Sequence, residues 1–159
     1  MHDNIKKRIN IAAKRQPADL VIKNCKIVNV FTHEIIEGDI AISDGKIAAV
    51  GNYSGEKEVD AEGRYALPGF INSHIHIESS FVSPEEFSRL VVPHGTTTII
   101  ADPHEIVNVC GMDGFDYMVK AGKNAALDIK YMIPSCVPCT PWEHAGAVVD
   151  SKAIREGIN

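Results

Sequence analysis

The sequence lacks the features that mark secreted, membrane-spanning and nucleic-acid-binding proteins. No apolar run reaches the roughly 18 residues that a membrane-spanning helix needs, and no apolar segment follows the first residues as it does in a secretory signal. The formal net charge is -5, and no basic stripe offsets it, which argues against a nucleic-acid partner. The four cysteines are too scattered for a disulfide framework, so we expect a reducing, cytoplasmic location.

Cys136 and Cys139 are the one pair of cysteines with a spacing known from metal and redox sites. A structural zinc site needs a second pair of ligands, and no other CxxC or finger-like histidine pair accompanies them. A thioredoxin-like site places its first cysteine at a helix start, and the segment 140–142 does not have the pattern of a long helix. A redox protein is therefore kept as an alternative that thiol titration of a Cys136 variant can test.

Residues 1–66 indicate a helix followed by a small antiparallel β unit. Asn4 is placed to cap a helix that ends before Pro17. Two β-branched runs, 20–22 and 27–30, predict strands. An Asp-Gly pair at 44–45 separates two further alternating runs and predicts a hairpin, because both turn positions need a positive φ. This unit carries no obvious catalytic group.

Residues 67–159 show strands alternating with helices. The expected elements are a strand at 70–76, a helix at 84–92 capped by Ser83, a strand at 96–101, a helix at 114–126 and a strand at 129–134. Strand, helix, strand, helix, strand at this spacing requires a parallel sheet. We therefore predict an α/β fold for this part of the chain.

Two histidines, His74 and His76, end the first strand of this second part. Residues two apart on a strand share one face, and the carboxyl ends of parallel strands are where such folds bind ligands. Two adjacent neutral imidazoles suit a divalent transition metal. We predict that this pair binds a metal ion, over the simpler interpretation that the two histidines only end a strand.

A second polar group, Asp102, His104 and Glu105, follows the second strand and should lie at the same edge of the sheet. Its members are candidates for metal ligation, or for orienting the metal-binding side chains and the substrate through hydrogen bonds. The alternative is that Asp102 caps a helix and that the other two side chains are exposed. The pattern leaves open which of the three contacts the metal.

Three further residues are candidates for a substrate pocket. Glu78 lies two positions past His76, although it could equally be an exposed acid near a helix start. Ser135 and Cys136 follow the third strand and could line the wall of the pocket. We assign none of the three as catalytic.

Several segments resemble a known family. The stretch 67–76, which contains both histidines, is similar to the signature of the amidohydrolase superfamily. Within that superfamily, the segments 76–80, 93–98, 101–106 and 134–138 resemble the adenine deaminase family, in matching order and spacing.

The resemblance implies a fold, a reaction and a cofactor. It implies a (β/α)8 barrel and the hydrolysis of adenine to hypoxanthine and ammonia in purine salvage. It also implies a binuclear divalent metal centre, commonly of manganese or iron, with His74 and His76 on one of the two metals.

A closed barrel takes roughly 250 residues, so we expect about three barrel strands in this chain. In the family the bridging carboxylate, further metal histidines and the catalytic aspartate come from later strands, and we expect them beyond Asn159. We accordingly expect no catalytic residue within the chain and little activity from it alone. The open edge of the third strand makes a homo-oligomer a further expectation.

Beside the redox protein, two further alternatives to an adenine deaminase remain. Amidohydrolases of the dihydroorotase or imidazolone-hydrolase type share the two histidines but not the segments 102–105 and 134–138. A non-catalytic, truncated metal-binding module is the other alternative. Activity on a panel of substrates would distinguish an adenine deaminase from another amidohydrolase. The number and affinity of the bound metal ions would distinguish it from a non-catalytic module.

Overall fold

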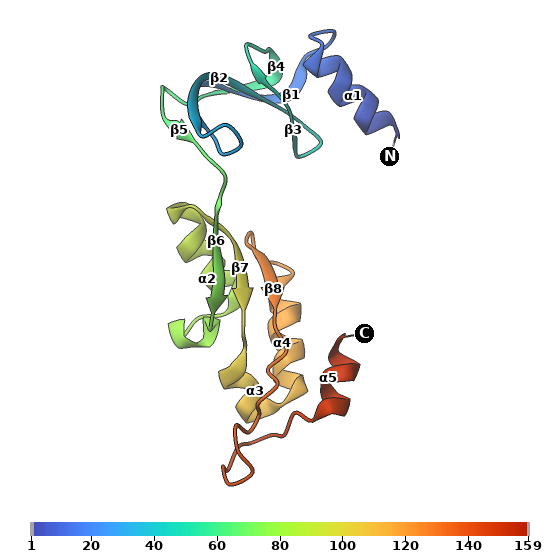
Figure 1. Cartoon of the computed structure of the whole chain (residues 1–159), viewed down its shortest axis with the longest axis vertical. Helices are drawn as coiled ribbons and strands as arrows, with labels where there is room; N and C mark the ends of the chain where they lie inside the picture. The colour runs from blue at the N-terminus through green and yellow to red at the C-terminus, as the bar shows by residue number, and fades with distance from the viewer. Residues whose placement is uncertain (1, 159) are drawn as a thin grey trace. The chain divides into compact units, whose positions relative to one another are not determined.

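A computed structural model describes residues 2–158, and the chain divides into two compact units, one up to Pro68 and one from Gly69 (Figure 1). Within the part of the chain that the structure describes, no helix is both long and apolar enough to span a membrane.

The first unit is a helix and a five-stranded mixed sheet. Its elements are α1 (His2–Ala12), β1 (Ala18–Asn29), β2 (Glu34–Ser43), β3 (Lys46–Gly51), β4 (Gly55–Asp60) and β5 (Tyr65–Ala66). The strand order is β3-β2-β1-β4, and β5 also pairs with β1. The first three strands are antiparallel, whereas β4 and β5 run parallel to β1. The expectation of a wholly antiparallel unit was therefore wrong for β4 and β5, because the chain crosses from the β3 edge to the other side of β1 instead of making another hairpin.

Strand β1 is one continuous element where the sequence indicated two short strands. A shift in register between Ile22 and Cys25 marks a bulge against β2. Asn24 lies in this bulge with a φ of 55°, a left-handed conformation that asparagine tolerates better than most residues. The polar interruption in the sequence therefore bends the strand without ending it.

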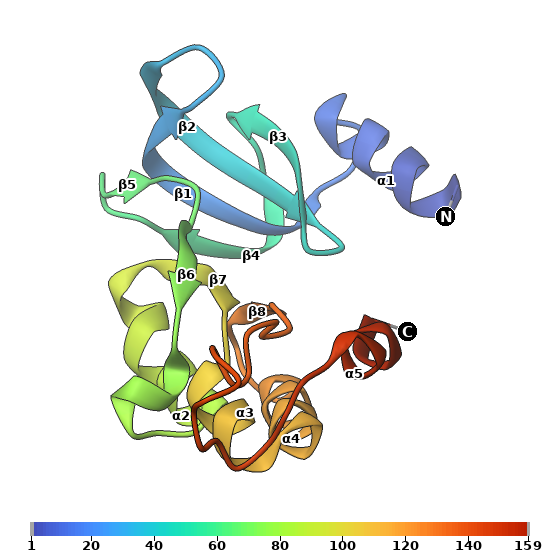
Figure 2. The ribbon, with the colours of Figure 1, turned by 60° about the horizontal axis from the view of Figure 1, so that its bottom comes forward.

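The predicted hairpin is present between β2 and β3, where Asp44 and Gly45 have φ values of 52° and 69°. The first helix begins at His2, so Asn4 lies inside it and is not its cap. Figure 2 shows α1 beside β3, and Ile11 of this helix is fully buried in the core of the unit.

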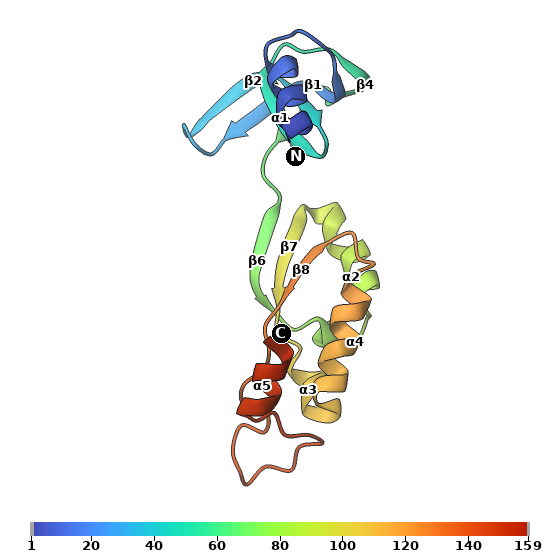
Figure 3. The same ribbon diagram turned by 90° about the vertical axis from the view of Figure 1, so that its right-hand side faces the viewer.

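The second unit is a three-stranded parallel sheet with helices. Its elements are β6 (Phe70–Ile75), the 3-10 helix η1 (Ile77–Ser80), α2 (Pro84–Val91), the 3-10 helix η2 (Val92–His94), β7 (Thr96–Ala101), α3 (His104–Cys110), α4 (Met112–Gly122), β8 (Asp128–Tyr131) and α5 (Ser151–Ile158). The strand order is β6-β7-β8, with all pairs parallel. Figure 3 shows α2 and α4 on the same side of this sheet. The predicted α/β fold is confirmed, and the order of its elements is that in which a (β/α)8 barrel begins.

Two features of this unit differ from the expectation. The helix α3 follows the Asp-Pro dipeptide at 102–103, and its N-cap is Pro103 rather than Asp102, the cap that the alternative interpretation named. Helix α4 begins and ends earlier than 114–126. Strand β8 ends at Tyr131, so Ser135 and Cys136 lie in the loop beyond the strand rather than at its end.

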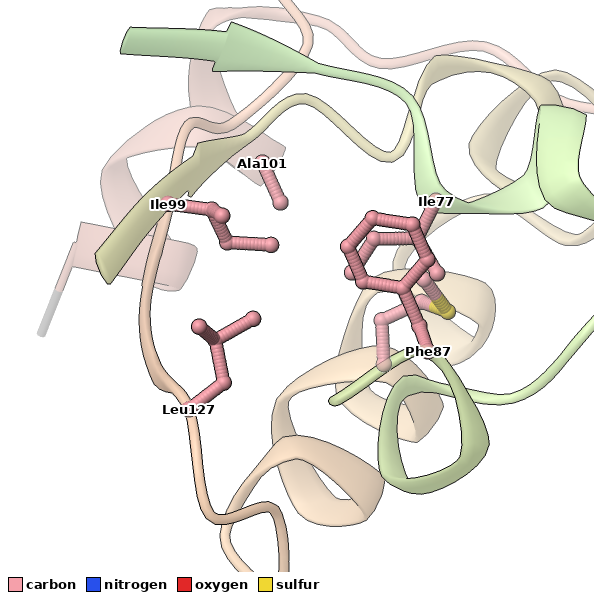
Figure 4. Packing of buried hydrophobic residues seen from close by; sticks show 6 residues of the cluster. Ile77, Phe87, Ile99, Ala101 and Leu127 are labelled. Atoms are coloured by element: carbon pink, nitrogen blue, oxygen red, sulfur yellow. The ribbon is translucent and has the colours of Figure 1, made fainter. Parts of the chain in front are cut away.

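The core of the second unit lies directly behind the ends of β6 and β7. Figure 4 shows Ile77, Phe87, Ile99, Ala101 and Leu127 packed together. Ile77 belongs to η1, and Ile99 and Ala101 belong to β7, so the segment that follows β6 and the end of β7 are anchored in the same buried cluster. This packing holds the two strand ends in a defined relative position.

Candidate metal centre

The carboxyl ends of β6 and β7 bring the predicted ligands together. Ile75 pairs with Ala101 in the parallel register, and the backbone N–H of Asp102 donates to the carbonyl of Ile75 at 2.8 Å. His76 and Asp102 are the first residues after the two strands. Two neighbouring strands thus deliver one side chain each to the same edge of the sheet.

His74, His76 and Asp102 form a group of three possible metal ligands. One donor atom from each lies within 4.8 Å of the other two. His74 is exposed, His76 is half-buried and Asp102 is buried, with 8% of its surface exposed. The two residues that follow strands are therefore better shielded from water than His74, which lies within β6.

The spacing of the two imidazoles fits a shared ion. Their Nε2 atoms are 3.2 Å apart, and the rings meet edge to face at 78°. Two nitrogen ligands at about 2.1 Å from one tetrahedral ion lie about 3.4 Å apart. Two unprotonated ring nitrogens repel each other at this distance, so either a proton or a cation has to lie between them. The donor set therefore suits a divalent ion.

His104 contacts Asp102 and lies outside the group of three. Its Nδ1 lies 3.1 Å from both carboxylate oxygens of Asp102, and its Nε2 lies 3.4 Å from the Sγ of Cys136. Burial lowers the pKa of His104, but the hydrogen bond and charge of Asp102 raise it more, so that the pKa lies above its usual value. His104 is thus placed to orient the Asp102 carboxylate.

Glu105 faces His76 from the first turn of α3. Its Oε2 lies 3.1 Å from the Nδ1 of His76, which is within ion-pairing distance although the two atoms are not aligned as a hydrogen bond. Its Oε1 accepts a hydrogen bond of 2.9 Å from the Oγ of Ser79 in η1. Nothing in the sequence pattern singles out Ser79, because its orientation depends on how η1 turns toward α3.

Glu78 is a half-buried carboxylate beside the group. Its Oε1 accepts a hydrogen bond of 3.3 Å from the backbone N–H of Ile106, while its Oε2 is buried and has no hydrogen-bond partner among the described residues. Burial raises the pKa of Glu78 above its usual value. The residue lines a cavity of about 280 Å³ together with Phe81, Tyr117 and others.

The structure thus divides the predicted site residues into three sets. His74, His76 and Asp102 converge, and His104, Glu105 and Glu78 surround them. Cys136 and Ser135 form the third set, in the loop after β8: Cys136 contacts His104, whereas Ser135 is exposed.

Comparison with known proteins gives one family and many relatives. The model of the amidohydrolase family matches residues 65–158. Adenine deaminase 2 of Desulfotalea psychrophila is 63% identical over 97% of this chain and 27% of its own length. The adenine deaminase of Geobacillus kaustophilus is 55% identical over 100% of this chain and 28% of its own. The chain therefore spans about a quarter of the length of these relatives.

Among solved structures, N-acyl-D-glutamate deacylase from Bordetella bronchiseptica superposes with a TM-score of 0.46 and 28% sequence identity. The superposition covers 60% of this chain and 19% of the deacylase.

Proposed function

Because this chain belongs to the amidohydrolase family, we propose that it is the amino-terminal part of an adenine deaminase, which hydrolyses adenine to hypoxanthine and ammonia. The substrate is inferred from relatives named adenine deaminase, which are 50% to 63% identical over most of this chain. The observation that carries the chemistry is the convergence of His74, His76 and Asp102 at the ends of two parallel strands. We place the reaction in purine salvage and in the cytoplasm.

In this proposal His74, His76 and Asp102 hold one divalent ion, manganese or iron, of a binuclear centre. Such an ion would lower the pKa of a bound water toward neutrality, and this would supply the nucleophile for hydrolysis at neutral pH. His104 holds the Asp102 carboxylate in place. Glu78, Ser135 and Cys136 form part of the wall against which adenine binds. Further ligands and the catalytic aspartate come from other parts of the complete protein.

The test is ammonia release from adenine by the complete protein that contains this chain, loaded with Mn²⁺. The variants His74→Ala and His76→Ala should each be slower by at least about 100-fold, because each removes a direct ligand and even indirect partners are worth 10- to 100-fold. His94→Ala is the matched control, since His94 is exposed and lies just before β7, at the opposite end of this strand from Asp102. Full activity in both ligand variants would refute the proposed site.

The same preparation distinguishes the alternatives. Hydrolysis of dihydroorotate or of an imidazolone without release of ammonia from adenine would assign the protein to another amidohydrolase type. Metal binding without turnover of any of these substrates would indicate a non-catalytic metal-binding module. Oxidation and reduction of the Cys136–Cys139 pair with a measurable potential would support a redox protein instead.

A further inference from the structure

One nitrogen of the candidate metal centre is buried and lacks a hydrogen bond. The Nδ1 atom of His76 is shielded from solvent and has no hydrogen-bond partner among the described residues. A buried polar nitrogen without a partner is costly, so such atoms in folded proteins are nearly always paired. The Oε2 atom of Glu105, on a half-exposed side chain, is the acceptor that lies 3.1 Å away.

Glu105 is itself held from the other side. Its second oxygen, Oε1, accepts a hydrogen bond of 2.9 Å from the Oγ of Ser79. Ser79 lies in η1, directly after the two histidines, while Glu105 lies in the first turn of α3. The carboxylate therefore bridges the segments that follow β6 and β7, and the serine restricts its motion where burial alone would not.

The position of one proton on His76 decides whether this residue can ligate. A neutral imidazole carries its hydrogen on one nitrogen and a lone pair on the other. A hydrogen on Nε2 would point toward the Nε2 of His74 at 3.2 Å and block ligation through that atom. A hydrogen on Nδ1 would face the Glu105 carboxylate and leave Nε2 free. A carboxylate accepts but cannot donate, so its placement favours the second arrangement.

We propose that Glu105 is a positioning residue for His76: its carboxylate, held by Ser79, accepts the Nδ1–H of His76 and so presents an unprotonated Nε2 to a divalent ion. This inference rests on the proposed metal site and adds to it the residue that sets the tautomer of one ligand. Glu105 is not a member of the group of three possible ligands, His74, His76 and Asp102. Its effect on the metal ion would be indirect, through His76.

The first experiment determines the tautomer without metal. Long-range ¹H–¹⁵N correlation spectra of the ¹⁵N-labelled, metal-free chain at about pH 8, above the usual histidine pKa of about 6.5, show which ring nitrogen of His76 carries the hydrogen. We expect Nδ1–H in the wild-type chain and a shift toward Nε2–H in Glu105→Ala. Glu105→Gln should restore Nδ1–H, because an amide oxygen still accepts, and Ser79→Ala should give an intermediate result.

The second experiment measures the affinity for Zn²⁺ by competition with a chromophoric chelator. Glu105→Ala should weaken binding by about 10- to 100-fold, as is usual for the partner of a ligating histidine, with partial recovery in Glu105→Gln. Glu86→Ala is the matched control, because Glu86 is an exposed glutamate in the first turn of α2 and should change neither reading.

Two results would overturn the proposal. One is Nε2–H in the wild-type chain or an unchanged tautomer in Glu105→Ala. The other is an unchanged Zn²⁺ affinity in Glu105→Ala despite a shifted tautomer. If the wild-type chain binds no Zn²⁺ while the tautomers behave as expected, the proposed metal function fails and the Glu105–His76 contact stands. Glu105→Gln and Ser79→Ala keep the test decisive if Glu105→Ala does not fold.

Discussion

The three side chains at the candidate centre are held to different degrees. Asp102 is buried and meets the His104 ring through both of its oxygens, whereas His74 is exposed and contacts the ring of His76. A ligand that is already in place loses little conformational freedom when an ion binds. We therefore expect Asp102 to contribute more to the affinity for a metal ion than the exposed His74 does.

We predict that Asp102→Asn lowers the Zn²⁺ affinity of this chain by at least about 10-fold, because a neutral amide replaces a pre-oriented anionic ligand. Titration calorimetry measures the effect. Asp116→Asn is the control, since Asp116 is an exposed carboxylate that pairs with Lys120 on α4. Equal affinities for both variants would remove Asp102 from the centre.

The cysteines should divide by reactivity. Cys25 is 2% exposed and burial raises the pKa of its thiol, whereas Cys110, Cys136 and Cys139 are exposed. The thiolate is the reactive form, so we predict three fast thiols and one slow thiol in a titration with an aromatic disulfide. Cys25 should react only upon unfolding, and fast reaction of Cys25 in the folded chain would contradict its position in the sheet.

At the level of elements, Phe87 is the largest side chain that α2 buries in the core of the second unit. Phe87 is 6% exposed and packs in the cluster that contains Ile77 and Ile99. The helix also has a defined start, since the Oγ of Ser83 accepts a hydrogen bond from the backbone N–H of Glu86. The predicted cap at Ser83 is thereby confirmed.

We predict that Phe87→Ala destabilises the second unit by about 3 to 5 kcal/mol, because it removes a buried aromatic ring and leaves a cavity. Phe81→Ala is an unusually close control, as Phe81 is 96% exposed and should change stability by less than about 0.5 kcal/mol. Urea unfolding followed through the amide signals of β7 and α2 provides the comparison. Similar midpoints for the two variants would contradict the packing of α2.

In the first unit, one buried carboxylate links three segments. Asp39 of β2 accepts hydrogen bonds from the Nζ of Lys23 at 2.7 Å, the backbone N–H of Asn24 at 3.1 Å and that of Tyr53 at 3.2 Å. Burial raises the pKa of Asp39, but these hydrogen bonds lower it more, so that the pKa lies below its usual value.

This arrangement predicts a pH dependence. The folded-state pKa of Asp39 lies below the unfolded value of about 3.9, so its stabilisation is complete well above that pH and is lost as the pH falls through the folded-state value. Asp39→Asn should cost about 1 to 3 kcal/mol at pH 7 and flatten the acid dependence below about pH 4. Urea unfolding at pH 7 and pH 3, followed through the amide signals of β1 and β2, tests both. An unchanged acid profile would show that other carboxylates dominate.

For the whole molecule, local chemistry made some elements predictable. The β-branched run 96–101 became β7 with the expected bounds, because its side chains suit a pleated strand. The Asp-Gly turn at 44–45 followed from its need for positive φ. The period of a strand predicted that His74 and His76 share a face, and their position at the end of the predicted strand placed them at the carboxyl edge of the sheet.

The remainder depends on contacts between segments far apart in the sequence. The parallel pairing of β4 and β5 with β1 is set by the path of the chain across the sheet, which no local pattern encodes. The helices α3 and α5 are short, and both pack in the cluster around Val107. The same holds within the site: a sequence places Asp102 near the two histidines, but not Ser79 against Glu105.

All three convergent donors come from the single stretch 74–102, in which one strand crosses over to its neighbour. An insertion elsewhere in the gene would therefore leave the spacing of these three donors along the chain unchanged. A transplant of this one crossover, with the core that supports it, would carry all three candidate donors into another parallel sheet in their present spacing.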